Sequence, residues 1–181
     1  MREGLVIAVS QDALHRFSKR PVTSVVLVEG LGVEGDAHAG ATVQHRYLKR
    51  RAKALPNLRQ VHLIASELFD ELKNRGFVVA PGALGENITT RGIDLLNLPL
   101  GTTLRLGERA AVRLTGLRVP CALIDKFKNG LKRQLIQPPG SPSRFRAGVM
   151  SVVAVSGAVR VGDTVRVELP PPPWISLPPL P

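Results

Sequence analysis

A chain of 181 residues, 44% of them hydrophobic, can bury one substantial core, which predicts a single folded domain. Its one cysteine excludes an internal disulfide, a Cys/His zinc framework and an iron–sulfur cluster held by this chain alone. A formal net charge of +11 predicts attraction to anions, whether small phosphate-bearing molecules, nucleic acid or acidic partners. The apolar run at residues 5–9 is too short for a signal peptide or a membrane span, so we expect a soluble cytoplasmic protein.

The first third of the sequence predicts strands joined by polar loops. Residues 3–9, 23–28 and 59–65 have strand composition. The glycine-rich stretch at residues 30–40 is typical of a turn that needs positive φ or close backbone approach to a ligand. It contains Asp36 and His38, which with His45 would allow a metal site but lack a third well-spaced ligand. The alternative is that the Asp36 carboxylate binds amides of its own loop.

Residues 46–53 form the densest basic run, around Tyr47. A nucleic-acid patch with one stacking aromatic is one interpretation. We favour a solvated loop, because aromatic residues make up only 4% of the chain and no nucleic-acid motif occurs.

The middle of the chain predicts a helix and a second glycine-rich loop. Ser66 is the expected N-cap of a helix that runs to about Asn74. In the loop at residues 81–87, Glu86 could be a general acid or base and Asn87 an amide that orients a ligand. Both side chains could instead cap amides of the loop, and composition does not separate the two readings.

Cys121 is expected in a loop just past the end of a strand. The alternation of residues 111–115 slips at Gly116, which predicts a β-bulge of the kind that often lies beside active sites. Pro120 ends ladder pairing. The nearby cation of Arg118 favours a thiolate, the form that attacks or binds metal, whereas a lone cysteine can also be a small buried hydrophobe.

The last third predicts one helix and three strands. Residues 125–137 form an amphipathic pattern interrupted by Gly130. Residues 149–155 are apolar enough for a buried central strand, and residues 159–161 and 164–169 are expected to form a hairpin. Many short strands with two short helices favour a closed β structure.

The proline-rich tail at residues 170–181 is expected to lie outside the domain, which would span residues 1–169. Proline lacks the amide donor of a ladder, so we expect this tail to make no sheet and to be extended and disordered. Trp174 would be its anchor if a partner with an aromatic groove bound it.

Five segments in order resemble the MOSC domain, the module found at the C-terminus of molybdenum-cofactor sulfurases and as small free-standing bacterial proteins. They are GVEGDAHAG (32–40), RQVHLI (59–64), PGALGENI (81–88), DLL with LG (94–96, 100–101) and RVPC (118–121). The resemblance covers roughly residues 5–168. It implies a mainly β fold with short helices, a closed β-barrel related to the one in pyruvate kinase, in agreement with the strand pattern.

The resemblance also implies binding of the molybdenum cofactor, an anionic pterin with a phosphate and a dithiolene-held metal. A thiolate suits the metal and arginines suit the phosphate. Cys121 is then the expected metal ligand and catalytic residue. The expected cofactor-binding residues are Asp36, His38, Arg59, Gly85, Glu86, Asn87, Arg118, Arg144 and Arg146. Relatives reduce N-hydroxylated small molecules, and this chain would need electrons from partner proteins.

Two other functions stay open. Cys121 could carry a persulfide, accepting sulfur from a cysteine desulfurase, in which case pyridoxal phosphate would sit on that partner and not on this chain. The basic barrel and its tail could also be a non-catalytic interaction module.

Overall fold

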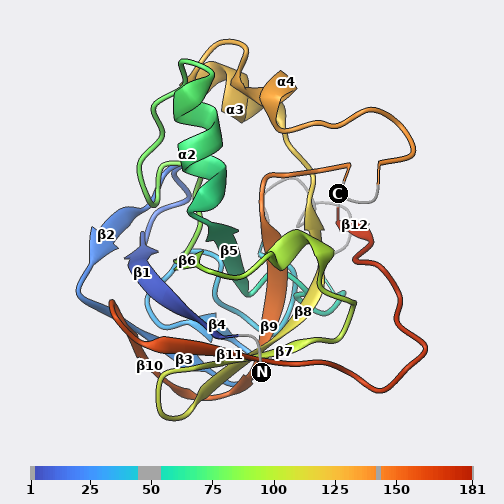
Figure 1. Ribbon diagram of the computed structural model, residues 1–181. Coiled ribbons are helices and arrows are strands. Elements are labelled where there is room, and N and C mark those ends of the chain that lie inside the picture. The colour runs from blue at the N-terminus through green and yellow to red at the C-terminus, as the bar shows by residue number, and fades with distance from the viewer. Residues whose placement is uncertain (1–2, 45–53, 142–143, 181) are drawn as a thin grey trace.

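The computed structural model describes residues 3–44, 54–141 and 144–180, and most of its strands form one closed barrel (Figure 1). Neighbouring barrel strands follow the order β11-β7-β8-β9-β5-β6-β1, and β1 pairs back with β11, so seven strands close the ring. Their bounds are β1 (Glu3–Gln11), β5 (Val61–Ala65), β6 (Ile88–Arg91), β7 (Thr103–Leu106), β8 (Ala110–Arg118), β9 (Val149–Val155) and β11 (Thr164–Glu168). The expected mainly β, closed-barrel fold is confirmed.

Shorter strands extend this barrel. A separate three-stranded sheet has the order β10-β3-β4, with β3 (Ser24–Val28), β4 (Gly32–Val33) and β10 (Gly157–Arg160). β2 (Arg20–Val22) pairs with β1, and β12 (Pro179–Leu180) pairs with β8. Alternate side chains of the barrel strands point inward and form one apolar core, in which Val6, Leu104 and Leu114 are at most 1% exposed.

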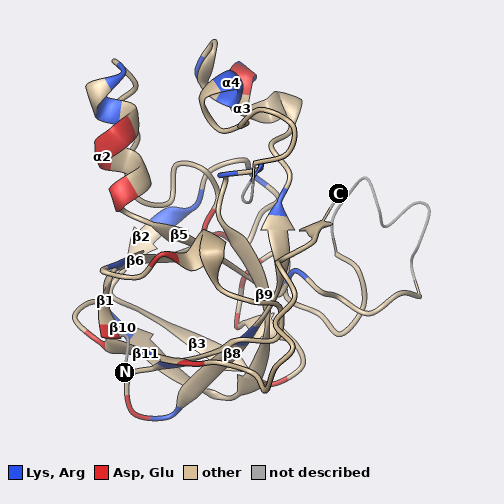
Figure 2. Cartoon of the chain, turned by 45° about the vertical axis from the view of Figure 1, so that its right-hand side comes forward, with Lys and Arg blue, Asp and Glu red and all other residues tan. Residues whose placement is uncertain are grey.

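Three α-helices in the described residues lie at one end of the barrel (Figure 1): α2 (Glu67–Asn74), α3 (Ala122–Phe127) and α4 (Leu131–Gln134). A 3₁₀ turn, η1 (Leu95–Asn97), precedes β7. A second apolar cluster, which includes Ile64, Leu72, Ile124 and Leu131, joins the helices to the barrel. Figure 2 shows acidic residues on α2 near its N-terminus, where the helix dipole favours them.

The predicted interruption at Gly130 is confirmed, because Gly130 has φ +80 and cannot continue a right-handed helix, so the segment forms two helices, α3 and α4. Two details differ from the predicted helices: α3 begins at Ala122, before the expected residue 125, and the cap of α2 lacks its side-chain bond. Ser66 does sit at the start of α2, but its hydroxyl makes no capping bond. Instead, Ser66 Oγ accepts a hydrogen bond from Arg91 Nε at 3.0 Å, which ties the helix to β6.

The expected hairpin at residues 159–169 is wrong. β10 pairs with β3, whereas β11 pairs with β7 and β1, so the two consecutive strands belong to different sheets. One bond ties the turn between them to β1 and another closes the turn itself: the Gly162 amide donates to the Val6 carbonyl at 2.8 Å, and Asp163 Oδ2 accepts from the Arg160 amide at 2.7 Å. These bonds direct the chain from one sheet into the next.

The expectation that the proline-rich tail makes no sheet is also wrong for its last described residues. β12 runs parallel to β8, and the Leu117 amide donates to the Pro178 carbonyl at 2.8 Å. Proline lacks a donor but keeps its acceptor, so a proline-rich segment can still join a ladder through its carbonyls. We call residues 170–180 the C-terminal strap. In Figure 1 it is drawn in red and runs along the outside of the barrel to β12.

The predicted slip at Gly116 is confirmed, because the pairing of β8 with β9 shifts register between Leu114 and Gly116. The basic run at residues 46–53 and His45 lie outside the described residues. No helix in the part of the chain that the structure describes is long and apolar enough to span a membrane.

Candidate functional site

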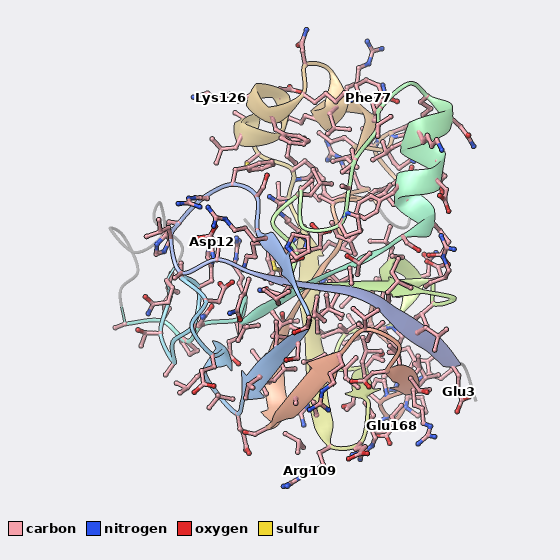
Figure 3. All side chains as sticks on the ribbon, turned by 90° about the vertical axis from the view of Figure 1, so that its left-hand side faces the viewer. Glu3, Asp12, Phe77, Arg109, Lys126 and Glu168 are labelled. Carbon is pink, nitrogen blue, oxygen red and sulfur yellow. The ribbon has the colours of Figure 1, made fainter. Side chains whose placement is uncertain are left out.

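The candidate site lies where β8 ends, at the helical end of the barrel. Figure 3 labels Lys126 and Phe77 at this end and Arg109 and Glu168 at the opposite one. The last residue of β8 is Arg118, and the buried Pro120 then turns the chain, so that Cys121 precedes α3 with an extended backbone and an exposed thiol. The predicted position of Cys121, just beyond a strand end, is confirmed.

Two arginines near this strand end each have one side-chain nitrogen without a partner in the described part of the chain. Arg59 Nη2 and Arg118 Nη1 are buried nitrogens with no hydrogen-bond partner among the described residues. Burial lowers the pKa of both guanidinium groups, and the positive charge of Arg118 lowers the pKa of Arg59 further. The charges of Cys121 and Glu86 oppose this shift at Arg118. Two neighbouring cations with free donors form a setting that an anion would neutralise.

Glu86 uses one carboxyl oxygen for structure and leaves the other free. Oε1 accepts hydrogen bonds from the Gly82 amide at 2.6 Å and from Thr89 Oγ1 at 3.3 Å. Oε2 is buried with no partner among the described residues. Burial raises the pKa of Glu86 although these hydrogen bonds oppose the shift. Glu86 therefore caps its loop and also carries a buried oxygen that can hold a proton.

The glycine-rich loop packs closely on the segment that follows β1. A Cβ on Gly85, which has φ +84, would lie 2.6 Å from the Phe17 carbonyl oxygen. The ring of Phe17 is 5.9 Å from the Arg118 guanidinium carbon and 5.6 Å from the ring of Phe127. Only glycine permits this approach, which brings an aromatic face beside Arg118.

Asp36 is the centre of a buried polar network. Its carboxylate lies 2.6 Å from Lys19 Nζ and accepts hydrogen bonds from Asn87 Nδ2 at 3.1 Å and the His38 amide at 2.9 Å. Burial raises the pKa of Asp36, but the hydrogen bond from the His38 ring (Nδ1–Oδ1 3.3 Å) and the Lys19 charge outweigh it and hold the pKa far below its ordinary value. Burial lowers the pKa of Lys19, partly opposed by Asp36.

This network bears on the metal alternative for Asp36 and His38. Asp36 binds an amide of its own loop, as the structural interpretation predicts. The described residues contain no group of three or more His, Cys, Asp or Glu side chains placed to hold a metal ion. Lys19 carries no sequence signal, since it stands in a polar loop like many solvated lysines.

His62 is a second residue that the sequence did not single out. It is 5% exposed, its amide donates to Asn87 Oδ1 at 3.2 Å, and its Nε2 lies 2.8 Å from the Ala147 carbonyl oxygen. Burial, reinforced by the charge of Arg118, lowers its pKa well below the ordinary value, so the ring is neutral. A Cβ on Gly148 would lie 2.7 Å from Nε2, so a glycine is needed beside this ring.

Arg144 and Arg146 have other contacts. Arg146 forms a two-pronged ion pair with Glu71 of α2, with Nη1–Oε2 at 2.8 Å and Nη2–Oε1 at 2.9 Å. Arg144 is exposed, and its guanidinium carbon lies 5.4 Å from the Phe145 ring centre. The contacts and electrostatic couplings above link the Asp36 network with Arg59, Glu86, Asn87 and Arg118. Arg144 and Arg146 instead contact Phe145 and Glu71.

The comparisons with known proteins agree with this architecture. The crystal structure of the YuaD protein from Bacillus subtilis superimposes with a TM-score of 0.76 at 21% identity, covering 93% of this chain and 97% of that one. YiiM from Escherichia coli gives 0.64 at 18% identity, covering 95% and 73%, and YiiM from Geobacillus stearothermophilus 0.63 at 20%, covering 95% and 77%. At these identities the likeness shows the fold.

A search of the curated proteins found no match. Residues 35–166, however, match the sequence model of the family described as the MOSC domain. That stretch runs from Gly35, within the first glycine-rich loop, through the second glycine-rich loop and Cys121 to β11, and so includes most of the candidate site. The chain belongs to the MOSC domain family.

Proposed function

We propose that this protein binds the molybdenum cofactor, with the Cys121 thiolate as ligand to the metal, and reduces N-hydroxylated small molecules with electrons from partner proteins. One observation carries the proposal. The charges of Arg59 and Arg118 interact, and each residue has a buried guanidinium nitrogen without a partner among the described residues. Such nitrogens destabilise a protein unless something accepts their hydrogen bonds.

The donor set suits this cofactor. Two guanidinium groups match a phosphate, and a thiolate is a soft ligand for the metal. The close-packed glycine-rich loop at residues 81–87 would place its backbone beside the flat pterin ring. When bound, the cofactor would supply two-electron redox chemistry at the metal. Arg59 and Arg118 would hold its anionic part, and Cys121, exposed at the strand end, would reach the metal.

We assign to Glu86 the role of holding a proton for the reaction. Reduction of an N–O bond to an amine and water consumes protons along with electrons. A buried carboxyl with a raised pKa, whose Oε2 has no partner among the described residues, can hold a proton at neutral pH more readily than an exposed one. The neutral His62, fixed between Asn87 and Ala147, keeps the strand and the glycine loop in register beside it.

The test is elemental analysis for molybdenum, with pterin fluorescence, on protein made in a cofactor-competent host. Wild type is compared with Cys121→Ser and with Arg59→Met. We expect near-stoichiometric molybdenum in wild type, loss of the metal in Cys121→Ser, and loss of pterin as well in Arg59→Met. Absence of both from folded wild-type protein would refute cofactor binding, and full metal retention by Cys121→Ser would refute its role as ligand.

A sulfur carrier is the second candidate, favoured by the solvent exposure of the Cys121 thiol. A cysteine desulfurase holding pyridoxal phosphate would transfer sulfur to Cys121, which would then carry a persulfide. Mass spectrometry after incubation with a desulfurase and cysteine separates the two functions. A +32 Da addition (about the mass of one sulfur atom) that a thiol reductant removes, on wild type but not on Cys121→Ser, in protein without molybdenum, would favour this candidate.

A further inference from the structure

The C-terminal strap is joined to the strand that carries Arg118. β7 pairs with β8 as far as Arg113, and Leu114 still bonds the residues just before β7. Beyond that point the strap takes over the same edge, with Pro179 opposite Leu117 and Leu180 opposite Arg118. Without it, the last residues of β8 would have one open edge.

The strap is anchored along its length. The Leu100 amide donates to the Ile175 carbonyl at 2.7 Å, Ser176 forms a bridge with Pro99, and Leu177 is buried at 6% exposure. Trp174 Nε1 donates to the Pro170 carbonyl at 3.0 Å, which folds the proline run on itself. These contacts give the strap one fixed path to β8.

Gly116 makes room for the strap. A Cβ at this position would lie 2.5 Å from the Pro178 carbonyl oxygen and 2.6 Å from Leu180 Cγ. Its φ is not in the left-handed region, so backbone conformation alone does not call for glycine here. The close approach of the strap is therefore the reason that the structure offers for a glycine at the bulge.

We propose that the C-terminal strap is a positioning element of the candidate site, which holds the end of β8 so that Arg118 presents its free guanidinium nitrogen to an anion. On one side the Arg118 amide donates to the Gly148 carbonyl at 2.9 Å, and on the other Leu180 pairs with Arg118. This inference rests on the proposed anion-binding role of Arg59 and Arg118 and adds a part to it that touches no ligand.

The experiment measures binding of inorganic phosphate by calorimetry at low ionic strength. Leu177→Ser places a hydroxyl in the strap's buried contact, and Ile175→Ser is its matched control, because Ile175 is 63% exposed. We expect Leu177→Ser to raise the phosphate dissociation constant about tenfold, within the usual range for coupled sites, and Ile175→Ser to leave it unchanged. An unchanged constant in Leu177→Ser with a released strap would overturn the proposal.

Trp174 reports whether the strap is docked, since it is the only tryptophan. A chain ending at Leu169 removes the strap altogether, and a synthetic peptide of residues 170–181 added in trans should restore phosphate affinity. A purely structural role would lower the melting temperature without a rescue of affinity. If the shortened chain does not fold, the Leu177→Ser and Ile175→Ser pair decides the outcome.

If strap docking strengthens phosphate binding, phosphate binding must equally strengthen strap docking. Phosphate should therefore protect amides of the strap from hydrogen exchange. We expect amide exchange at Leu177 and Leu180 to slow with phosphate in wild type and not in Arg118→Met. If Arg59→Met and Arg118→Met both bind phosphate as wild type does, the proposed anion site fails. If they lose binding while the strap variants keep it, only the positioning role fails.

Discussion

Two pairs of charged residues with buried side-chain atoms differ in how they are compensated. Lys19 and Asp36 have opposite charges 2.6 Å apart, and Asn87 and the loop amides take up further hydrogen-bonding capacity. Arg59 and Arg118 have like charges and buried nitrogens without described partners. The first pair is compensated within the protein and holds loops together, whereas the second has donors without described partners, on which the proposed anion binding rests. The contrast separates a supporting pair from the pair that we propose binds an anion.

Removing Asp36 should produce the largest change. Asp36→Asn leaves the Lys19 ammonium buried without a counter-charge, and loss of one partner of a buried pair costs about 3–5 kcal/mol of unfolding free energy. Urea unfolding at pH 7 measures it. Glu71→Gln, which breaks a half-exposed pair with Arg146, should cost less than about 1 kcal/mol. Equal effects from the two variants would contradict the contrast.

The same pair makes a pH prediction. The folded-state pKa of Asp36 is depressed, so its contribution is present above the ordinary carboxyl value of 3.8 and is lost as pH falls toward the folded pKa. The stability difference between wild type and Asp36→Asn should therefore be constant from pH 5 to 7 (about one unit above that value and higher) and shrink in acid. A difference that grows in acid would show that the sign is wrong.

Glu86 should show the opposite pH dependence. Burial raises its pKa in the folded state, so its contribution is present below the ordinary value of 4.5 and is lost as pH rises through the folded pKa. Relative to Glu86→Gln, ligand-free wild type should lose stability with rising pH at up to about 1.4 kcal/mol per pH unit. Unfolding curves across this range test it, and a flat difference would mean that the carboxyl is solvated.

Arg59→Met tests the second of the two pairs, Arg59 and Arg118. It removes one of two neighbouring cations whose nitrogen has no described partner, so ligand-free stability should change by less than about 1 kcal/mol or rise. Phosphate affinity should nevertheless fall. A loss of stability as large as that of Asp36→Asn would show that Arg59 supports the fold itself.

Cys121→Ser should have the smallest effect on stability, within about 0.5 kcal/mol, because the thiol is exposed and fills no core position. Thermal unfolding of the cofactor-free proteins measures this effect. A large loss would mean that Cys121 has a packing role, and would weaken its assignment as a ligand.

Local pattern was enough to predict most strands, the bulge at Gly116 and the position of Cys121 just past a strand end. These features depend on neighbours in sequence: alternation, a glycine where the phase slips and a proline that ends pairing. Lys19 and His62 gave no such signal, because their roles come from Asp36 and Asn87, which lie far away along the chain. The assignments of β10, β11 and β12 to their partners were missed for the same reason, since turn composition does not reveal which strands will pair.

The pairing of β1 with β11 has a consequence for biosynthesis. Glu3 lies opposite Arg166, so the first strand of the barrel is also completed by nearly the last one. While the chain emerges from the ribosome, β1 can pair with β2 and later with β6. Residues 3–5 of β1 stay unpaired on the other side until β11 has been made. Contacts of such long sequence separation form slowly, and open strand edges promote aggregation. Closure of this barrel therefore requires that β11 has been synthesised, and nascent chains stalled before β11 should be the ones that need chaperone protection.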